Sequence, residues 1–128
     1  MLWAKKLNMS KTNLQYDAAI KQCKNIFISK TKDYGTAWRV LRMISVVDQI
    51  FIKALRIRTI QEKKMQLVGD DIASEFKGIV NYAVIGMIQL ELGNAQVEEL
   101  PIEQVSEWYD KYVSFAKKTM QSKNHDYG

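Results

Sequence analysis

The stretch Lys30-Thr31-Lys32-Asp33-Tyr34-Gly35 recurs at the end of the chain as Lys123-Asn124-His125-Asp126-Tyr127-Gly128. The interval from Asp33 to Asp126 is 93 residues, and at this interval eight of the twenty positions from 16 to 35 are identical. A repeat at a fixed interval indicates a duplicated structural unit. The sequence therefore predicts one complete repeat at residues 10–97 and the truncated start of a second at 98–128. We expect the natural protein to continue beyond Gly128.

Apolar residues recur at helical intervals before both stretches. In the first copy they are Tyr16, Ile20, Cys23 and Phe27, and their counterparts in the second copy are Tyr109, Val113, Ala116 and Met120. Intervals of four, three and four residues place side chains on one side of an α-helix. The pattern predicts an all-α fold, a helical bundle of about four helices. We expect the stripe of the last helix to need a partner, which is either a second copy of the chain in a homo-oligomer or the missing second repeat.

The same periodicity predicts helices at about residues 13–32, 37–65 and 70–92, and a fourth that starts near Pro101. Gly35 is expected to end the first helix in the left-handed conformation, and Thr36 is expected to cap the second. Five apolar side chains of the second helix are expected to face the core: Ile44, Val47, Phe51, Leu55 and Ile60.

Composition restricts the class of protein. The chain has 128 residues, one cysteine, one proline and six glycines, which suits a single domain that folds on hydrophobic burial without disulfides. Cys23 lies on the apolar stripe of the first helix, so we expect it to be buried. The most apolar run, residues 79–90, is interrupted by polar side chains and is too short to span a bilayer. The sequence predicts a cytoplasmic protein without a membrane segment.

Charge is distributed unevenly along the chain. The net charge is +5, but residues 1–66 are strongly basic whereas residues 67–110 are acidic. Two interpretations stay open, because the blocks could pair within the molecule or could build a site for phosphate and a metal ion. Nucleic acid is disfavoured as a partner, since the acidic block adjoins the basic helix and would repel a phosphate backbone.

Three groups of residues could carry chemistry. Asp71 and Glu75 are four residues apart on one side of the third predicted helix, where they could share a Mg²⁺ ion or could be ordinary solvated or ion-paired side chains. Lys53 and Arg56 form a short basic strip on the second helix, suited to phosphate or to acids of the next helix. The Asp33-Tyr34-Gly35 turn could hold a ligand or simply end a helix.

The ordered set of motifs points to a family. Lys30-x-x-Asp33-Tyr34-Gly35-x-Ala37-Trp38, Asp48-Gln49, Lys53-x-x-Arg56, Asp71-x-x-x-Glu75 and Asn81-Tyr82-Ala83 resemble the nucleotide-modification-associated domain family over about residues 16–92. A more distant similarity is to the all-α nucleoside triphosphate pyrophosphohydrolases of the MazG-like kind.

The resemblance implies a nucleotide partner and a role for each matching residue. Asp71 and Glu75 would be catalytic and would bind Mg²⁺, and the residues expected to contact the substrate or its phosphates are Lys30, Asp33, Tyr34, Lys53, Arg56 and Asn81. The sequence departs from the pyrophosphohydrolase pattern, because the second helix has no paired acids and Gly78 stands where a further acid is usual. Besides Mg²⁺-dependent hydrolysis of deoxynucleoside triphosphates, a non-catalytic nucleotide-binding module or a structural helical module stays open.

Overall fold

The computed structural model describes the backbone at residues 2–63, 68–94 and 99–127 and the side chains of residues 10–63, 71–94 and 99–124. It contains helix α1 (Leu2–Tyr34), the 3-10 helix η1 (Ala37–Val40), and helices α2 (Met43–Lys63), α3 (Val68–Leu92) and α4 (Ile102–Tyr127). No strand occurs in these described parts of the chain. The predicted all-α bundle is therefore confirmed.

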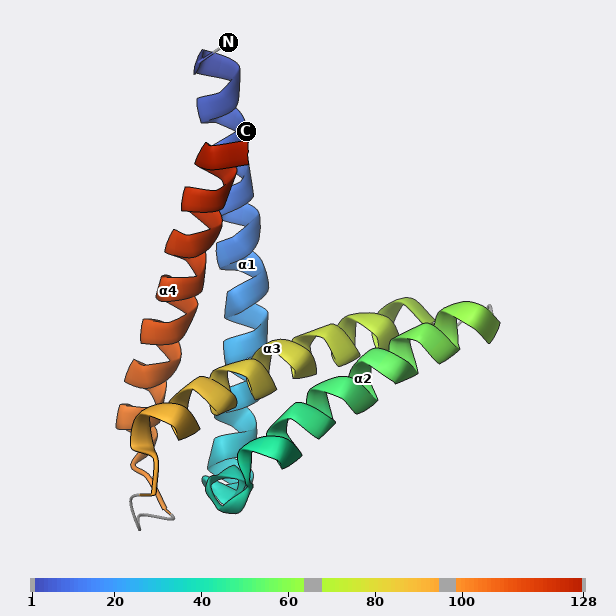
Figure 1. Ribbon diagram of the computed structural model, residues 1–128, viewed down its shortest axis with the longest axis vertical. Coiled ribbons are helices and arrows are strands. Elements are labelled where there is room, and N and C mark those ends of the chain that lie inside the picture. Colours follow the sequence, from blue (N-terminus) through green and yellow to red (C-terminus); the bar gives the residue numbers. More distant parts are fainter. Residues whose placement is uncertain (1, 64–67, 95–98, 128) are drawn as a thin grey trace.

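Two pairs of helices make up the molecule (Figure 1). Helices α1 and α4 lie side by side and run in opposite directions, and α2 and α3 form a hairpin that crosses α1. Helix α3 contacts all three other helices. None of the helices in the described ranges combines the length and apolar character needed to cross a membrane.

A buried network ties α1, α3 and α4 together. Tyr109 is completely buried, and its hydroxyl donates a hydrogen bond of 2.7 Å to Oδ1 of Asn81. The amide nitrogen of Asn81 donates to the carbonyl oxygen of Cys23 over 3.0 Å. The ring of Tyr109 also packs 4.9 Å from that of Phe27. Because buried polar groups are costly unless paired, this network defines how the three helices meet.

Cys23 is buried, as the sequence predicts. Burial raises the pKa of its thiol above the ordinary value, and the raised pKa keeps it protonated. A protonated, buried thiol is a poor nucleophile. The structure thus supports a packing role for this residue.

The first two helix boundaries differ from the sequence-based ones. Helix α1 begins at Leu2 rather than near residue 13, because the apolar stripe used to place its start begins only at Tyr16. The predicted helix at 37–65 is instead a 3-10 turn followed by α2, with an extended residue, Leu41, between them. Thr36 does not cap through its side chain. Its hydroxyl accepts a hydrogen bond of 3.0 Å from the backbone N–H of Leu100.

A side chain of α3 explains the break between η1 and α2. The amide nitrogen of the buried Gln89 donates to the carbonyl oxygens of Trp38, Arg39 and Leu41 at 2.9–3.1 Å. In a continuous helix these carbonyls would accept from backbone N–H groups four residues later, whereas here the Gln89 side chain supplies donors to them. The carbonyl of Trp38 also accepts from the backbone N–H of Leu41. The guanidinium of Arg39 donates to Oε1 of the same amide over 2.5 Å. A tertiary contact therefore divides the segment that the local sequence favours as one helix.

The inward side of α2 was predicted incorrectly. Ile44, Val47, Phe51 and Leu55 are all exposed, and only Ile60 of the expected set is partly buried. Helix α2 instead buries Val46 and Ile57. Apolar residues lie on more than one side of this helix, and periodicity does not reveal which side meets α3.

The stripe of the last helix is buried only in part. Tyr109 and Val113 lie in the core that α1 and α3 share with α4, whereas Ala116 is exposed and Met120 is partly buried. The expected association of this stripe with a second copy or a second repeat stays a prediction.

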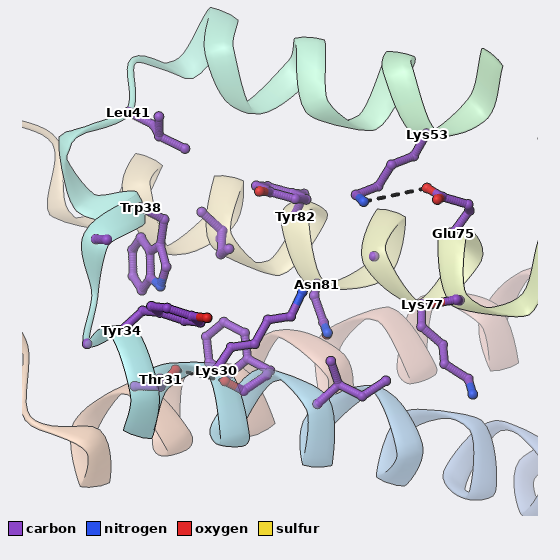
Figure 2. Close-up of a pocket in the computed structure, with 17 residues that line it drawn as sticks. Lys30, Thr31, Tyr34, Trp38, Leu41, Lys53, Glu75, Lys77, Asn81 and Tyr82 are labelled. Carbon is purple, nitrogen blue, oxygen red and sulfur yellow. Dashed lines mark hydrogen bonds and ion pairs between the residues drawn. The ribbon is translucent and has the colours of Figure 1, made fainter. Parts of the chain in front are cut away.

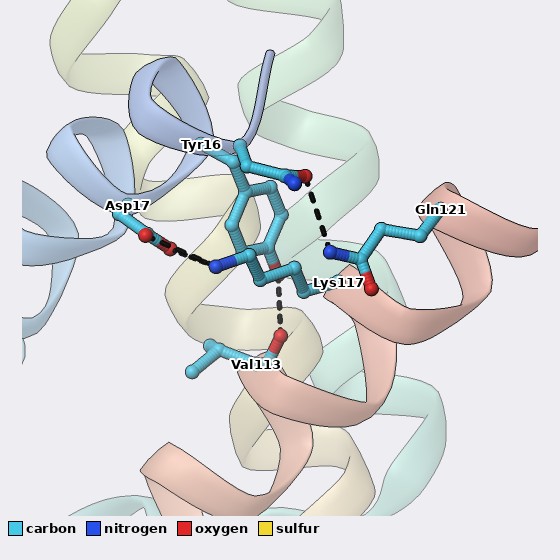
Figure 3. Close-up of polar contacts among 6 residues, drawn as sticks. Tyr16, Asp17, Val113, Lys117 and Gln121 are labelled. Atoms are coloured by element: carbon cyan, nitrogen blue, oxygen red, sulfur yellow. Dashed lines mark hydrogen bonds and ion pairs between the residues drawn. The ribbon is translucent and has the colours of Figure 1, made fainter. Parts of the chain in front are cut away.

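Two reciprocal ion pairs join α1 and α4. Lys117 lies 2.8 Å from Asp17 (Figure 3), and Lys24 lies 2.8 Å from Asp110. At the interval of 93 residues, Asp17 corresponds to Asp110 and Lys24 to Lys117. Each pair thus joins the aspartate of one predicted copy to the lysine of the other. The repeat and its boundaries stay predictions, and the side chains of the second turn, from His125 to Gly128, lie outside the described residues.

Gly35 ends α1 as expected, with φ of +64°. A Cβ atom built there would lie 2.5 Å from Oε1 of Glu99, whereas one at Gly93, with φ of +55°, would meet nothing within 4 Å. We expect Gly35→Ala to lower the free energy of unfolding by about 1–2 kcal/mol from backbone strain, and further from displacing Glu99. Gly93→Ala should lose only the unfolding free energy that comes from backbone strain. Urea unfolding of both variants measures the two losses in unfolding free energy. Equal losses would show that displacing Glu99 costs nothing.

Candidate functional site: a basic and aromatic pocket

A pocket of about 400 Å³ lies between the end of α1, η1 and the facing sides of α2 and α3 (Figure 2). Volumes of this size are typical of small-molecule sites. Seventeen residues line it: Ile26, Phe27, Lys30, Thr31, Tyr34, Gly35, Ala37, Trp38, Leu41, Lys53, Ser74, Glu75, Lys77, Gly78, Asn81, Tyr82 and Ile85.

Three lysines from three helices line the pocket. Lys30 comes from the last turns of α1, Lys53 from α2 and Lys77 from α3. Lys30 is exposed, whereas Lys53 and Lys77 are half-buried. Residues from separate helices meet here only because the hairpin of α2 and α3 crosses the end of α1. The result is a concentration of positive charge around a concave surface, which favours an anionic ligand.

Aromatic rings form the other part of the lining. Tyr34 and Trp38 lie together at one end of the pocket, and Tyr82 lies between them and Lys53. The ammonium of Lys53 is 5.8 Å from the centre of the Tyr82 ring. The indole N–H of Trp38 is buried and has no hydrogen-bond partner among the described residues. An unpaired buried donor costs free energy.

Glu75 is the one carboxylate in the pocket lining. It is 9% exposed, and its oxygens lie 3.5 Å from Nζ of Lys53 and 3.4 Å from Nε of Arg56. From the sequence, Glu75 could be a Mg²⁺ ligand or an ordinary solvated or ion-paired side chain. In the structure it is ion-paired with Lys53 and Arg56. Oε2 is buried and accepts no hydrogen bond from the described residues. The carboxylate offsets part of the positive charge of Lys53.

Gly78 makes room for Lys53. A Cβ atom built at Gly78 would lie 2.8 Å from Cε and 2.9 Å from Cδ of Lys53, closer than such atoms approach. The aliphatic part of Lys53 therefore lies directly over the backbone of α3 at this glycine. The side chain of Lys53 from the neighbouring helix therefore fills the space that a larger side chain at position 78 would need.

The structure brings together five of the eight residues expected to form a site. Lys30, Tyr34, Lys53, Glu75 and Asn81 line the pocket, although both ends of the Asn81 amide are engaged in the buried network.

The other three expected residues do not line the pocket. Arg56 touches Glu75 from outside it. Asp33 and Asp71 are exposed. Asp71 and Glu75 are thus not brought together in this cavity.

Sequence reasoning missed Lys77, and it did not assign a ligand role to Trp38 or Tyr82. Lys77 is four residues before Asn81 on α3, so the two share a side of that helix. That spacing could have indicated Lys77. Trp38 and Tyr82 stand inside quoted motifs, but only the crossing of the helices places their rings in one cavity.

The three comparisons with known proteins bear on this pocket. No curated protein and no solved structure matches the chain. The similarity to MazG-like pyrophosphohydrolases therefore stays a prediction. One family model, described as nucleotide modification associated domain 1, matches residues 30–90. All pocket-lining residues except Ile26 and Phe27 fall within this segment. The part of the chain that builds the pocket is therefore similar to nucleotide modification associated domain 1.

Proposed function

We propose that the pocket binds a nucleotide, with the base against Tyr34 and Trp38 and the phosphates towards Lys53 and Lys77. The observation that carries this proposal is the convergence of three lysines and three polar-edged aromatic side chains on one cavity. Stacking of a base on an aromatic ring contributes about 1–3 kcal/mol. Lysines bind phosphate oxygens through charge-assisted hydrogen bonds. The family of this segment supports a nucleotide over other anions.

The two ends of the pocket differ in character, and the difference sets the orientation of the ligand. Trp38 and Tyr34 lie at one end, and Lys53 lies towards the other, while the side chain of Lys77 runs away from Lys53 (Figure 2) and also lines a neighbouring pocket. Lys30, which is exposed, would approach the ligand from the solvent side.

Hydrolysis with Mg²⁺ stays a prediction. In the pocket lining the available carboxylate is Glu75, and two cations already lie within 3.5 Å of it. The described residues contain no group of three or more His, Cys, Asp or Glu side chains placed to hold a metal ion. One ion-paired carboxylate fits Mg²⁺ poorly, since this ion prefers oxygen ligands that are free to coordinate. The geometry therefore favours nucleotide binding without turnover.

Titration with deoxynucleoside triphosphates tests the proposal. We expect saturable binding by calorimetry and quenching of the tryptophan fluorescence, because a base would stack near Trp38. Trp38→Phe should remove most of the quenching, whereas Trp108→Phe on α4 should retain it. Lys77→Ala should weaken binding, and Lys63→Ala, an exposed lysine at the end of α2, should not.

Two further outcomes would distinguish nucleotide binding without turnover from hydrolysis and from a purely structural role. Pyrophosphate release that requires Mg²⁺ and disappears in the double variant Asp71→Asn, Glu75→Gln would establish the hydrolase and contradict the non-catalytic interpretation. Absence of calorimetric binding to all four deoxynucleoside triphosphates, with and without Mg²⁺, would refute the proposal and leave a structural helical module.

A further inference from the structure

Helix α2 exposes an ordered stripe on the side that does not meet α3. We call Ile44, Asp48, Phe51, Leu55, Arg58 and Glu62 the α2 seam. Its members follow one another at intervals of four and three residues, so they form a continuous line along the helix. The three apolar members are 45–61% exposed, and the flanking Val47 and Ile52 are exposed as well. In Figure 1 this helix lies at the edge of the molecule with α3 beside it.

An apolar stripe of this extent is unusual on the surface of a monomer. Soluble monomers rarely expose contiguous apolar patches, and larger ones mark interaction sites. The 21 residues of α2 give a surface about 30 Å long. The pocket does not use it, because the pocket is lined from α2 by Lys53, which points the other way towards α3.

We propose that the α2 seam is the contact between two copies of this chain, with the two α2 helices antiparallel about a two-fold axis. The charges along the seam support a second copy as the partner. Asp48 lies on one side of the apolar centre and Arg58 on the other. In an antiparallel pair centred between Phe51 and Leu55, Asp48 of each copy faces Arg58 of the other.

The same arrangement places apolar groups against one another at the centre. Phe51 of each copy faces Leu55 of the other, so two equivalent contacts form, as two-fold symmetry requires. Val47 and Ile52 lie beside this centre and enlarge the apolar area. At the ends, Arg58 already pairs with Glu62 of its own helix over 3.1 Å. Its guanidinium has enough donors to bond Asp48 of the second copy as well.

A partner other than a second copy would require a different arrangement of charges around the apolar stripe. A membrane surface or an acidic peptide is attracted by charges of one sign around an apolar stripe. The α2 seam instead has a negative group at one end and positive and negative groups at the other. In the antiparallel register the Asp48 and Arg58 positions are complementary to their own reverse, and Glu62 lies opposite Ile44 at each end. Matching charges on the two sides of an apolar centre favour a second copy as the partner.

Sedimentation of the whole chain and of charge variants tests the interface. We expect the wild type to dimerise, and Asp48→Lys and Arg58→Glu each to weaken dimerisation at least tenfold, because each places like charges opposite one another twice. A mixture of the two variants should restore the dimer, since both facing pairs then carry opposite charges. Phe51→Glu should abolish the dimer, whereas Phe115→Glu, at an exposed position on α4, should leave it unchanged.

Several results would overturn the proposal. One is a wild-type chain that stays monomeric at all accessible concentrations. A second is a mixture that fails to restore the dimer although both single variants retain the helical circular dichroism of the wild type. A third is loss of the dimer in Phe115→Glu with retention in Phe51→Glu, which would place the contact on α4.

Discussion

Replacing Tyr109 with alanine is expected to lower the free energy of unfolding by about 3–5 kcal/mol, the range for truncating a large, fully buried side chain. The ring is 0% exposed, and its centroid lies 4.9 Å from that of the Phe27 ring. The hydroxyl group adds a separate contribution. Its loss in Tyr109→Phe leaves Oδ1 of Asn81 buried without its donor, at a cost of about 1–3 kcal/mol.

The control is a second tyrosine on the same helix. Tyr112 is only partly buried, and its hydroxyl bonds to the carboxylate of Glu91, an exposed side chain. Tyr112→Ala should therefore destabilise the protein much less than Tyr109→Ala in the same urea titration. Equal losses would show that the buried network does not hold α1, α3 and α4 together.

The pH dependence gives a further check on Tyr109. Burial raises the pKa of its hydroxyl well above the ordinary value of 10.0. A raised pKa means that the folded state favours the protonated form. The corresponding stabilisation is complete below about pH 10 and declines as pH rises further, once the unfolded chain can ionise this tyrosine. The alkaline decline should be weaker in Tyr109→Phe.

The second large effect is expected on ligand affinity. Lys53→Ala should weaken nucleotide binding by about 10- to 100-fold, corresponding to one charge-assisted contact of about 1.4–2.8 kcal/mol. Removing this lysine also deprives Glu75 of one of its two cations, so the carboxylate would repel phosphate more strongly. Arg56→Ala should have a smaller effect, because Arg56 is mostly exposed and does not line the pocket.

Gly78→Ala separates binding from stability at the same place. The added methyl group would displace Lys53, whose Cε lies 2.8 Å from that position, and the displacement should reduce affinity. Alanine is a better helix former than glycine by about 1 kcal/mol, and a flexible lysine moves at little cost. We expect the unfolding free energy to be unchanged or higher. Calorimetry and urea unfolding on one preparation check both parts, and unchanged affinity would argue against phosphate binding by Lys53.

The local sequence was sufficient for the fold class and for several site residues. Intervals of three and four apolar residues reflect the geometry of one helix, so they identified all four helices and the buried side of α1 at Cys23 and Phe27. Gly35 was predicted as a helix end because left-handed φ favours glycine wherever it occurs. The motif from Lys30 to Asn81 identified the family that residues 30–90 match.

Tertiary structure alone decided where the site lies and which surface is left exposed. Lys30, Lys53 and Lys77 are far apart in sequence, and they converge because α2 and α3 cross the end of α1. The side of α2 that faces α3 could not be read from periodicity, since apolar residues occupy more than one side of that helix. Gln89 likewise ends η1 from fifty residues away in sequence. Local patterns record the preferences of one segment, whereas packing between segments determines which of those preferences are satisfied.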